Sequence, residues 1–232
     1  MRFVKKNRII HIEVQEGQLL PRGLVNSTTL HWREASPFKL LDRGIKNTVD
    51  YHTMSWDKRA IDLDDLMAPQ SHIVTGVRFR IVGTHLNLEI RVTEMNFEKG
   101  KLMDPESTSI WVSNDNTDSS PNKRTPVQLT KPDVPTSPTF GKSVIDSSTN
   151  QYIEFTHTDL DRDASQTTVP FLDAQEVTSL PAFALAGAGI HHKGQKLSGG
   201  FVALKLITYD MGQHIQMPQP NEEDDLHIVT LH

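Results

Sequence analysis

Alternating apolar and polar residues between Val77 and Val92 predict a β-hairpin. In the first half, Val77, Phe79 and Ile81 alternate with arginines. After a polar break the apolar residues Leu86, Leu88, Ile90 and Val92 alternate with Asn87, Glu89 and Arg91. A period of two sends successive side chains to opposite faces of a strand. We therefore expect an antiparallel hairpin with one buried face and one solvated face, the latter carrying opposed charges.

A second hairpin is predicted between Leu185 and Thr208. Its later strand alternates apolar residues with Ala203 and Lys205, and a turn is expected at 191–194. Five glycines occur in this stretch: Gly187, Gly189, Gly194, Gly199 and Gly200. Because glycine inside a strand often marks a bulge, we expect this hairpin to be the more irregular of the two.

The two hairpins belong to a stretch that occurs twice, the second copy 111 residues after the first. The matching pairs include Asp62 with Asp173 (173 − 62 = 111), Gly76 with Gly187 (187 − 76 = 111) and Gly83 with Gly194 (194 − 83 = 111). Self-similarity at a fixed offset indicates an internal duplication. The alternative is a chance match among common residue types.

The rest of the chain also favours β-structure. No segment has a sustained helical stripe, and a polar, proline-rich stretch separates the two copies. We predict an all-β fold, an antiparallel sandwich or barrel built from two similar halves, with a first half at 1–112, a linker or long loop at 113–150 and a second half at 151–232. Further short strands are expected at Ile9–Val14, Ser27–Trp32, Ser109–Val112, Tyr152–Phe155 and His227–Leu231.

Composition narrows the classes of function. The 232 residues carry a net charge of −5, which gives no general attraction to nucleic acid. No window approaches the roughly 18 apolar residues of a membrane helix, and the alternating start of the chain suits a strand better than a signal peptide. The chain has no cysteine, so disulfides, thiolate nucleophiles and cysteine-based zinc sites are excluded.

Searches for catalytic motifs are negative, and no catalytic residue, cofactor or metal is predicted. Asp159, Asp161 and Asp163 match the first three ligand positions of a calcium loop. However, Ala164 and Pro170 replace the glycine and glutamate that this loop requires at its sixth and twelfth positions. A solvated turn is favoured there. The acids Asp62, Asp64, Asp65, Asp173 and Glu176, which precede the hairpins, are interpreted as caps or turn residues.

A few aromatic residues suggest a sugar-binding surface. Trp56 lies in a polar context and is the best exposed candidate for stacking, with Trp32 as a second. Asp62, His85 and Asn87 are expected to supply hydrogen bonds to the ligand. The competing interpretation is that each tryptophan belongs to the core.

Two segments resemble a protein family. The stretches 67–93 and 181–191, which include the Met67–Gly76 run and the Gly187-Ala188-Gly189 triplet, are similar to an arthropod (insect) domain-of-unknown-function family. The resemblance implies an arthropod origin and an extracellular, secreted protein, the present chain then being a mature form or a fragment. It implies no activity for any residue.

Three functions follow as hypotheses. The first is a non-catalytic, lectin-like recognition module that binds a carbohydrate or glycoconjugate through loops at one end of the scaffold. The second is a structural or self-assembling extracellular protein whose partners are further copies of the chain. The third is a carboxylate-dependent hydrolase, which would need two convergent acids in a cleft.

Overall fold

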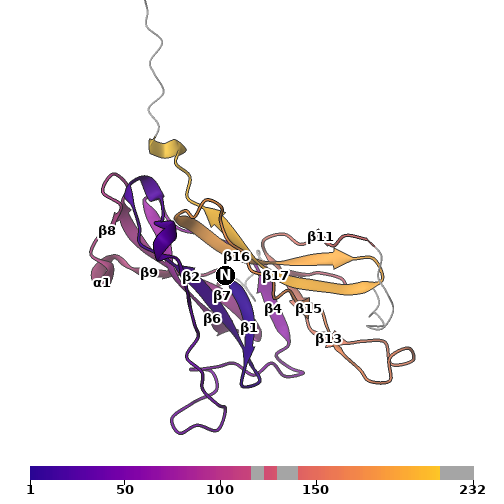
Figure 1. Ribbon diagram of the computed structural model, residues 1–232. Coiled ribbons are helices and arrows are strands. Elements are labelled where there is room, and N and C mark those ends of the chain that lie inside the picture. Colours follow the sequence, from indigo (N-terminus) through magenta and orange to yellow (C-terminus); the bar gives the residue numbers. More distant parts are fainter. Residues whose placement is uncertain (116–122, 130–140, 215–232) are drawn as a thin grey trace, which may run out of the picture.

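The computed structural model describes residues 1–115, 123–129 and 141–214 (Figure 1). Strands dominate it, and the regular helices of the described part are one four-residue α-helix and three 3₁₀ turns. The predicted all-β class is therefore confirmed. The strand expected at His227–Leu231 lies outside the described residues. In the described part, no helix is both long and apolar enough to cross a membrane.

A small antiparallel sheet opens the chain. It consists of β1 (Arg2–Lys6), β2 (Ile9–Glu16) and β3 (His31–Arg33) in that order. Asn7 and Arg8 form the two-residue turn between β1 and β2, and both have positive φ, as a tight hairpin turn requires. The predicted strand at Ile9–Val14 lies within β2, whereas Ser27–Thr29, expected as strand, forms the 3₁₀ turn η2.

The first predicted hairpin forms the main part of the second sheet. It consists of β6 (His72–Val82) and β7 (His85–Asn96), and the sheet runs in the order β10-β12-β4-β7-β6. Two further strands pair with β7 outside this path. The other strands of this sheet are β4 (Ala60–Leu63), β8 (Lys101–Leu102), β9 (Ile110–Val112), β10 (Thr125–Pro126) and β12 (Gln151–Glu154).

The second predicted hairpin, β16 (Leu185–Gln195) and β17 (Ser198–Thr208), lies in a third sheet ordered β11-β16-β17-β15. Its turn lies at residues 196–197 rather than at 191–194, and two register shifts interrupt it against one in β6–β7. It is therefore the more irregular hairpin, as predicted. The remaining elements are β5 (Asp65–Met67), β11 (Val144–Ile145), β13 (Thr156–His157), β14 (Thr168–Val169), β15 (Phe171–Leu172), α1 (Pro105–Thr108), η1 (Pro21–Gly23) and η3 (Gly212–His214).

The two hairpins share the same local topology. A short strand precedes each and pairs in parallel with its second strand, β4 with β7 and β15 with β17. The first strand of each hairpin has a register shift just before a glycine, Gly76 in β6 and Gly187 in β16. These positions are 111 residues apart (187 − 76 = 111). Both large sheets thus contain parallel pairs as well as the expected antiparallel ones.

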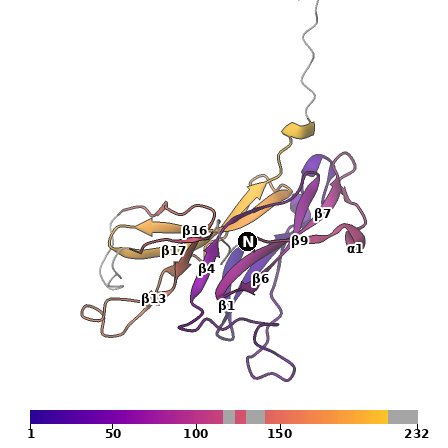
Figure 2. The ribbon, with the colours of Figure 1, turned by 180° about the vertical axis from the view of Figure 1, so that it is seen from behind.

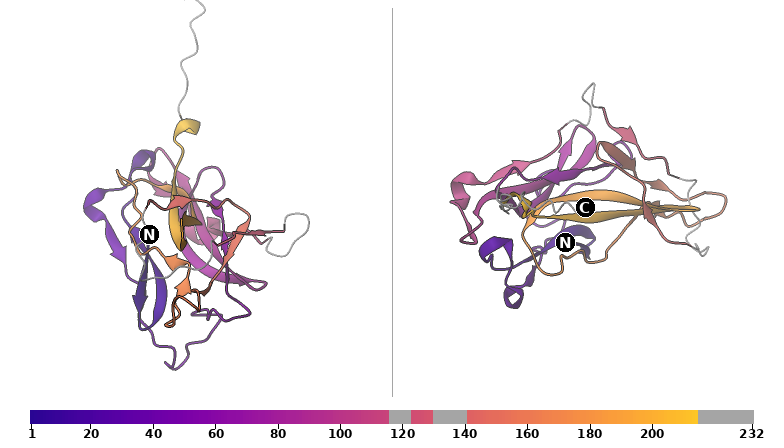
Figure 3. Two further views of the ribbon diagram at one scale, coloured as in Figure 1. Left: turned by 90° about the vertical axis from the view of Figure 1, so that its right-hand side faces the viewer. Right: turned by 90° about the horizontal axis from the view of Figure 1, so that it is seen from above.

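Besides a two-stranded sheet of β13 and β14, the described part has these three larger sheets, and one hydrophobic cluster joins them. It contains Phe3 from the first sheet, Ile61 and Ile90 from the second, and Ile190 and Leu204 from the third. The sheets also exchange strands along the chain, because β5 pairs with β16 and β12 pairs with β4. In the right-hand view of Figure 3, β16–β17 runs between the N-terminal strands and β6–β7. Figure 2, seen from behind, shows β16–β17 extending away from β6 and β7 to one side of the molecule. Within the described residues the arrangement of the sheets is sandwich-like, and the strand order does not close into a barrel.

The outer face of β7 corrects the prediction of a solvated surface. Asn87 and Glu89 are only 1% and 3% exposed. The expected opposed charges are present, since Arg78 and Arg80 both pair with Glu89 at 2.5 Å. The polar pattern was interpreted correctly as a separate face, but Asn87 and Glu89 are buried on that face, where the arginines of β6 lie against Glu89.

The acids that precede the hairpins are also not the caps that were expected. All of them form ion pairs: Asp62 and Asp64 with Arg124, Asp65 with Lys205, Asp173 with Lys193, and Glu176 with Arg2. Two of them also accept backbone N–H hydrogen bonds, Asp173 from Gln175 in a turn and Asp64 from Asn150. The positions of these acids before the hairpins can be read from the sequence. Their cationic partners cannot, because those residues lie far away along the chain.

Candidate functional site

The pairing of β12, β4 and β7 gathers three polar side chains on one face of the second sheet. Tyr152 lies opposite Asp62 in the β12–β4 register, and His85 opposes Ala60 in the parallel β4–β7 pair. His85 Nδ1 is 2.6 Å from Asp62 Oδ1, and the rings of His85 and Tyr152 lie 4.5 Å apart. The other face of these strands carries Ile61 and belongs to the core.

The guanidinium of Arg124 forms ion pairs with both Asp62 and Asp64. Its Nε lies 2.9 Å from Asp62 Oδ2, an ion pair in which the N–H does not meet hydrogen-bond geometry. Its Nη1 donates to Asp64 Oδ1 at 2.9 Å. All three side chains are buried. Because one guanidinium engages both carboxylates, Asp62 and Asp64 do not form the open acid pair that a hydrolase requires.

The exposed end of this face is formed by Trp56. It is 68% exposed, in a turn closed by the bridge between Ser55 and Lys58. The guanidinium carbon of Arg59 lies 4.0 Å from the centre of the Trp56 ring. Arg59 also donates to Glu154 Oε2 at 3.0 Å. Since Glu154 follows Tyr152 by two residues in β12, Trp56 is tied to the face that carries Tyr152 and His85.

The charges along this face act on Tyr152. Burial raises the pKa of its hydroxyl, and the nearby carboxylates of Glu154 and Asp62 raise it further. The hydroxyl is therefore a neutral hydrogen-bonding group over the physiological range.

Exposure distinguishes the three tryptophans. Each has an arginine over one ring face: Trp32 has Arg2 at 4.2 Å, Trp56 has Arg59, and Trp111 has Arg78 at 3.8 Å. Trp111 is 41% exposed, and Trp32 is half-buried in β3. Trp56 therefore offers the most open ring for stacking.

The predicted site residues are thus brought together in part. Trp56 and His85 lie along one face, where the side chain of His85 is 12% exposed. Asp62 and Asn87 are buried, so they support this face instead of contacting a ligand directly. Trp32 lies in the first sheet and is not part of the cluster.

Sequence reasoning missed four residues of the site: Arg59, Arg124, Tyr152 and Glu154. The alternation of Tyr152 and Glu154 about Ile153 signals a shared strand face. No local signal marks Arg124, which lies in a polar segment far from its partners along the chain. The acids at 159–163 stabilise their own turn, since Asp159 Oδ1 accepts from the Asp161 N–H and Asp163 Oδ2 from the Thr158 hydroxyl.

Comparison with protein-family models and with curated protein sequences found no match. The resemblance to an arthropod family therefore stays a prediction. The class that the structure itself defines is an all-β, sandwich-like protein with two long hairpins.

Proposed function

We propose that the protein is a non-catalytic, lectin-like module that recognises a carbohydrate or glycoconjugate on the face formed by Trp56, Arg59, Glu154, Tyr152 and His85. The observation that carries this proposal is the ring of Trp56, which is 68% exposed and held against Arg59. A ring oriented before binding loses little conformational entropy when a ligand stacks on it. We further propose an extracellular location, an arthropod origin and descent of the two hairpins from an internal duplication.

The neighbouring side chains suit a polyhydroxyl ligand. Arg59 donates in a planar fork, Glu154 accepts through two oxygens, and Tyr152 can do either. Adjacent hydroxyls of a sugar ring offer the matching donors and acceptors, while its C–H groups provide an apolar patch for Trp56. The site lies on an open face, which favours modest affinity.

Replacement of Trp56 tests the proposal. On a glycan array, the parent protein is expected to bind at least one glycan class, and Trp56→Ala should weaken that binding by about tenfold or more, roughly 1.4 kcal/mol. Trp111→Ala is the matched control, because Trp111 also has an arginine on its ring but lies at another place in the sheet. A Trp56→Ala protein that binds as well as the parent contradicts the site, and a parent that binds no glycan contradicts the function.

A second proposal, self-assembly, is favoured by one observation. β11 is the last strand of its sheet in the described part, and its Val144 and Ile145 are 62% and 60% exposed. Exposed apolar edge strands are prone to pair with other chains. Light scattering at micromolar concentration would then give a mass above 26.1 kDa, which Val144→Lys should return to that of a monomer.

A further inference from the structure

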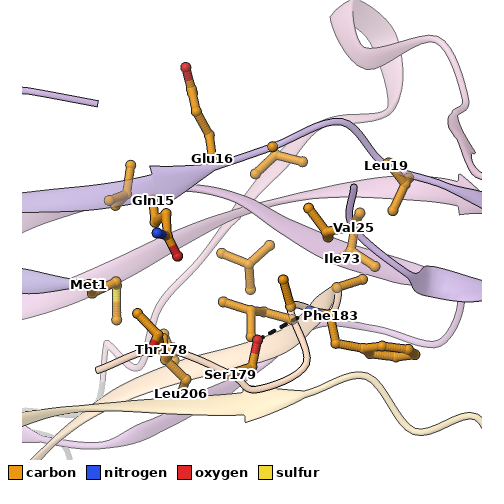
Figure 4. A pocket seen from close by; sticks show the side chains of 18 of the residues that line it. Met1, Gln15, Glu16, Leu19, Val25, Ile73, Thr178, Ser179, Phe183 and Leu206 are labelled. Atoms are coloured by element: carbon orange, nitrogen blue, oxygen red, sulfur yellow. Dashed lines mark hydrogen bonds between the residues drawn. The ribbon is translucent and has the colours of Figure 1, made fainter. Parts of the chain in front are cut away.

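A cavity of about 350 Å³ lies between the first and second sheets and the segment that leads into β16. Figure 4 shows Leu19, Val25 and Ile73 towards one end of it and Met1 towards the other. Protein interiors rarely leave voids larger than a water molecule, which takes about 30 Å³ in the liquid. The lining shares no residue with the proposed sugar-binding face. A ligand in this cavity would therefore bind independently of Trp56.

The cavity lies between the two hydrophobic clusters of the fold. Val14 and Val77 line it and pack against the larger cluster. Ile73 also lines it and belongs to the smaller cluster, against which Leu19 and Phe183 pack. These side chains contact a core on one side and border the cavity on another. An apolar occupant would join the two clusters and remove this apolar surface from water, which is favourable.

The second hairpin has an apolar occupant at the corresponding place. β5 pairs there with β16 at Gly187, Ala188 and Gly189. The middle residue of β5, Leu66, is 4% exposed and belongs to the larger cluster. β6 is the last strand of its sheet in the described part, and its residues Ile73–Val77 line the cavity instead. An apolar group in the cavity would thus lie beside β6 as Leu66 lies beside β16.

Water is a poor occupant for the deep wall of the cavity. Ile73, Ala184 and Ala188, which are 6%, 5% and 0% exposed, form part of this wall, and their side chains offer no hydrogen bond. A buried water molecule needs about two to four polar partners, whereas apolar cavities stay dry and bind apolar molecules. Since an apolar cavity of about 150 Å³ holds benzene, a cavity more than twice as large suits roughly eight to ten carbon atoms.

Neutral polar groups lie at one side of the cavity. Figure 4 shows Gln15 and Thr178 near the end at which Met1 lies, whereas the carboxylate of Glu16 points away, towards β3. None of the described side chains that line the cavity is cationic. Burial lowers the pKa of the Met1 amino group to about 6, so this group is largely neutral at pH 7. The cavity therefore offers hydrogen bonds but no fixed positive charge for an anion.

We propose that this cavity binds a small lipid-like molecule, an unbranched aliphatic chain that ends in one neutral polar group. The chain contacts the apolar walls, and the polar group hydrogen-bonds with Gln15 and Thr178. A hydroxyl both donates and accepts, so a medium-chain alcohol is the simplest member of this class. Sites for small molecules are typically cavities of about 300–1,000 Å³ with mainly apolar walls and a few polar groups. This cavity fits the lower end of that range.

Equilibrium dialysis of the full chain against radiolabelled 1-decanol tests the proposal. The parent should bind one molecule per chain with a dissociation constant in the micromolar range. Thr178→Trp places a large ring at the rim and should weaken binding by about tenfold or more. Thr178 is exposed, so this change leaves the core intact, as circular dichroism can verify. The matched control is Ser165→Trp, at an exposed turn position outside the lining.

Two outcomes of this experiment overturn the proposal. A parent protein that binds no 1-decanol shows that the cavity is not a site for this class of molecule. Equal affinity of Thr178→Trp and Ser165→Trp shows that any bound 1-decanol lies elsewhere on the protein. Binding that Thr178→Trp weakens and Ser165→Trp leaves unchanged supports the cavity as the site.

Competition against labelled 1-decanol tests the chemistry of the ligand. Affinity should rise from 1-hexanol to 1-decanol and stop rising at 1-dodecanol, because the cavity limits the length of chain that it can bury. Decanoate should compete about tenfold or more less well than 1-decanol at pH 7, since its charge finds no cation in the lining. Affinity that keeps rising with chain length indicates adsorption to the surface and refutes a bounded site. Decanoate that competes as well as 1-decanol refutes the neutral polar group.

Discussion

At the scale of single residues, each buried carboxylate in the described part of the chain lies against a cationic side chain. Glu13 is a clear example, since its side chain is 1% exposed within the first sheet. Lys6 Nζ lies 2.6 Å from one of its oxygens, and Arg2 Nη2 lies 3.0 Å from the other. The hydrogen bond from Lys6 lowers the pKa of Glu13 against the opposing effect of burial, and Arg2 lowers it further. The folded state therefore favours the ionised carboxylate.

Glu13→Gln should lower the melting temperature at pH 7. Because the pKa of Glu13 is lower in the folded than in the unfolded chain, its contribution to stability is complete above the unfolded value of about 4.5. It is lost as the pH falls through the folded pKa. The difference in melting temperature between parent and variant should thus shrink below pH 4.

Glu34→Gln is the control for this pH series. Glu34 also pairs with Lys6, at 3.3 Å, but its side chain is 77% exposed. Its replacement should change the melting temperature little at any pH. A difference between parent and Glu13→Gln that is as large at pH 3 as at pH 7 would contradict the assigned role of the Glu13 charge.

At the scale of elements, Arg124 joins the segment 123–129 to β4. This segment contributes β10, which pairs in parallel with β12. The side chain of Arg124, just before β10, contacts the buried carboxylates of Asp62 and Asp64. The guanidinium is fully buried, so the contact cannot be replaced by solvent. One side chain thus holds a connecting segment against the polar face of the sheet.

Arg124→Met should cost about 3–5 kcal/mol of unfolding free energy, because it leaves the Asp62 and Asp64 carboxylates buried without their cation. Urea denaturation provides the measurement. Adding Asp62→Asn and Asp64→Asn to the same chain should recover part of the loss. Arg59→Met, which removes an exposed ion pair, should cost at most about 1 kcal/mol. An Arg124→Met loss no larger than that of Arg59→Met would contradict this account.

Some strands, strand faces and turns could be predicted from the sequence, and others could not. Strict alternation predicted β6 and β7 as strands and correctly separated their faces, because the period of two follows from strand geometry. The solvation of the outer face was predicted wrongly, since Asn87 and Glu89 are covered by contacts that their own strand does not encode. The turn of the second hairpin was misplaced because its glycines lie within the two strands, two of them at register shifts, whereas the turn itself consists of Lys196 and Leu197. Of the residues in the proposed site, Trp56 and His85 were predicted from residue type and context. Arg124 was missed because it lies in sequence about 60 residues from its aspartates.

At the scale of the whole molecule, the two predicted halves of the chain share one core. Ile61 from the first and Ile190 from the second belong to the same buried cluster, and β5 and β12 each pair with a strand of the other half. Contacts that cross between halves make their unfolding interdependent. The predicted boundaries at 112 and 151 therefore do not separate two cores, because residues from both sides of them pack together.

We expect the described fold to unfold in a single cooperative transition. In calorimetry, Ile61→Ala and Ile190→Ala should each lower the temperature of that one transition, with losses of about 2–5 kcal/mol. Leu180→Ala is the control, because Leu180 is 98% exposed. Two separate transitions, each shifted by only one of the two isoleucine variants, would show that the halves are independent domains.

The amino-acid sequence by itself determined the β class, the two long hairpins and the face to which each of their side chains belongs. These properties depend on local alternation and need no knowledge of distant segments. Tertiary structure alone decided that β5 covers β16 while the equivalent edge of β6 borders a cavity. It also decided that Arg124 neutralises Asp62 and Asp64, and that Trp56 reaches the same face as His85 through Arg59 and Glu154. Strand edges and buried charges are satisfied by partners far away in the chain, and the spacing of residues does not specify which partner will be near.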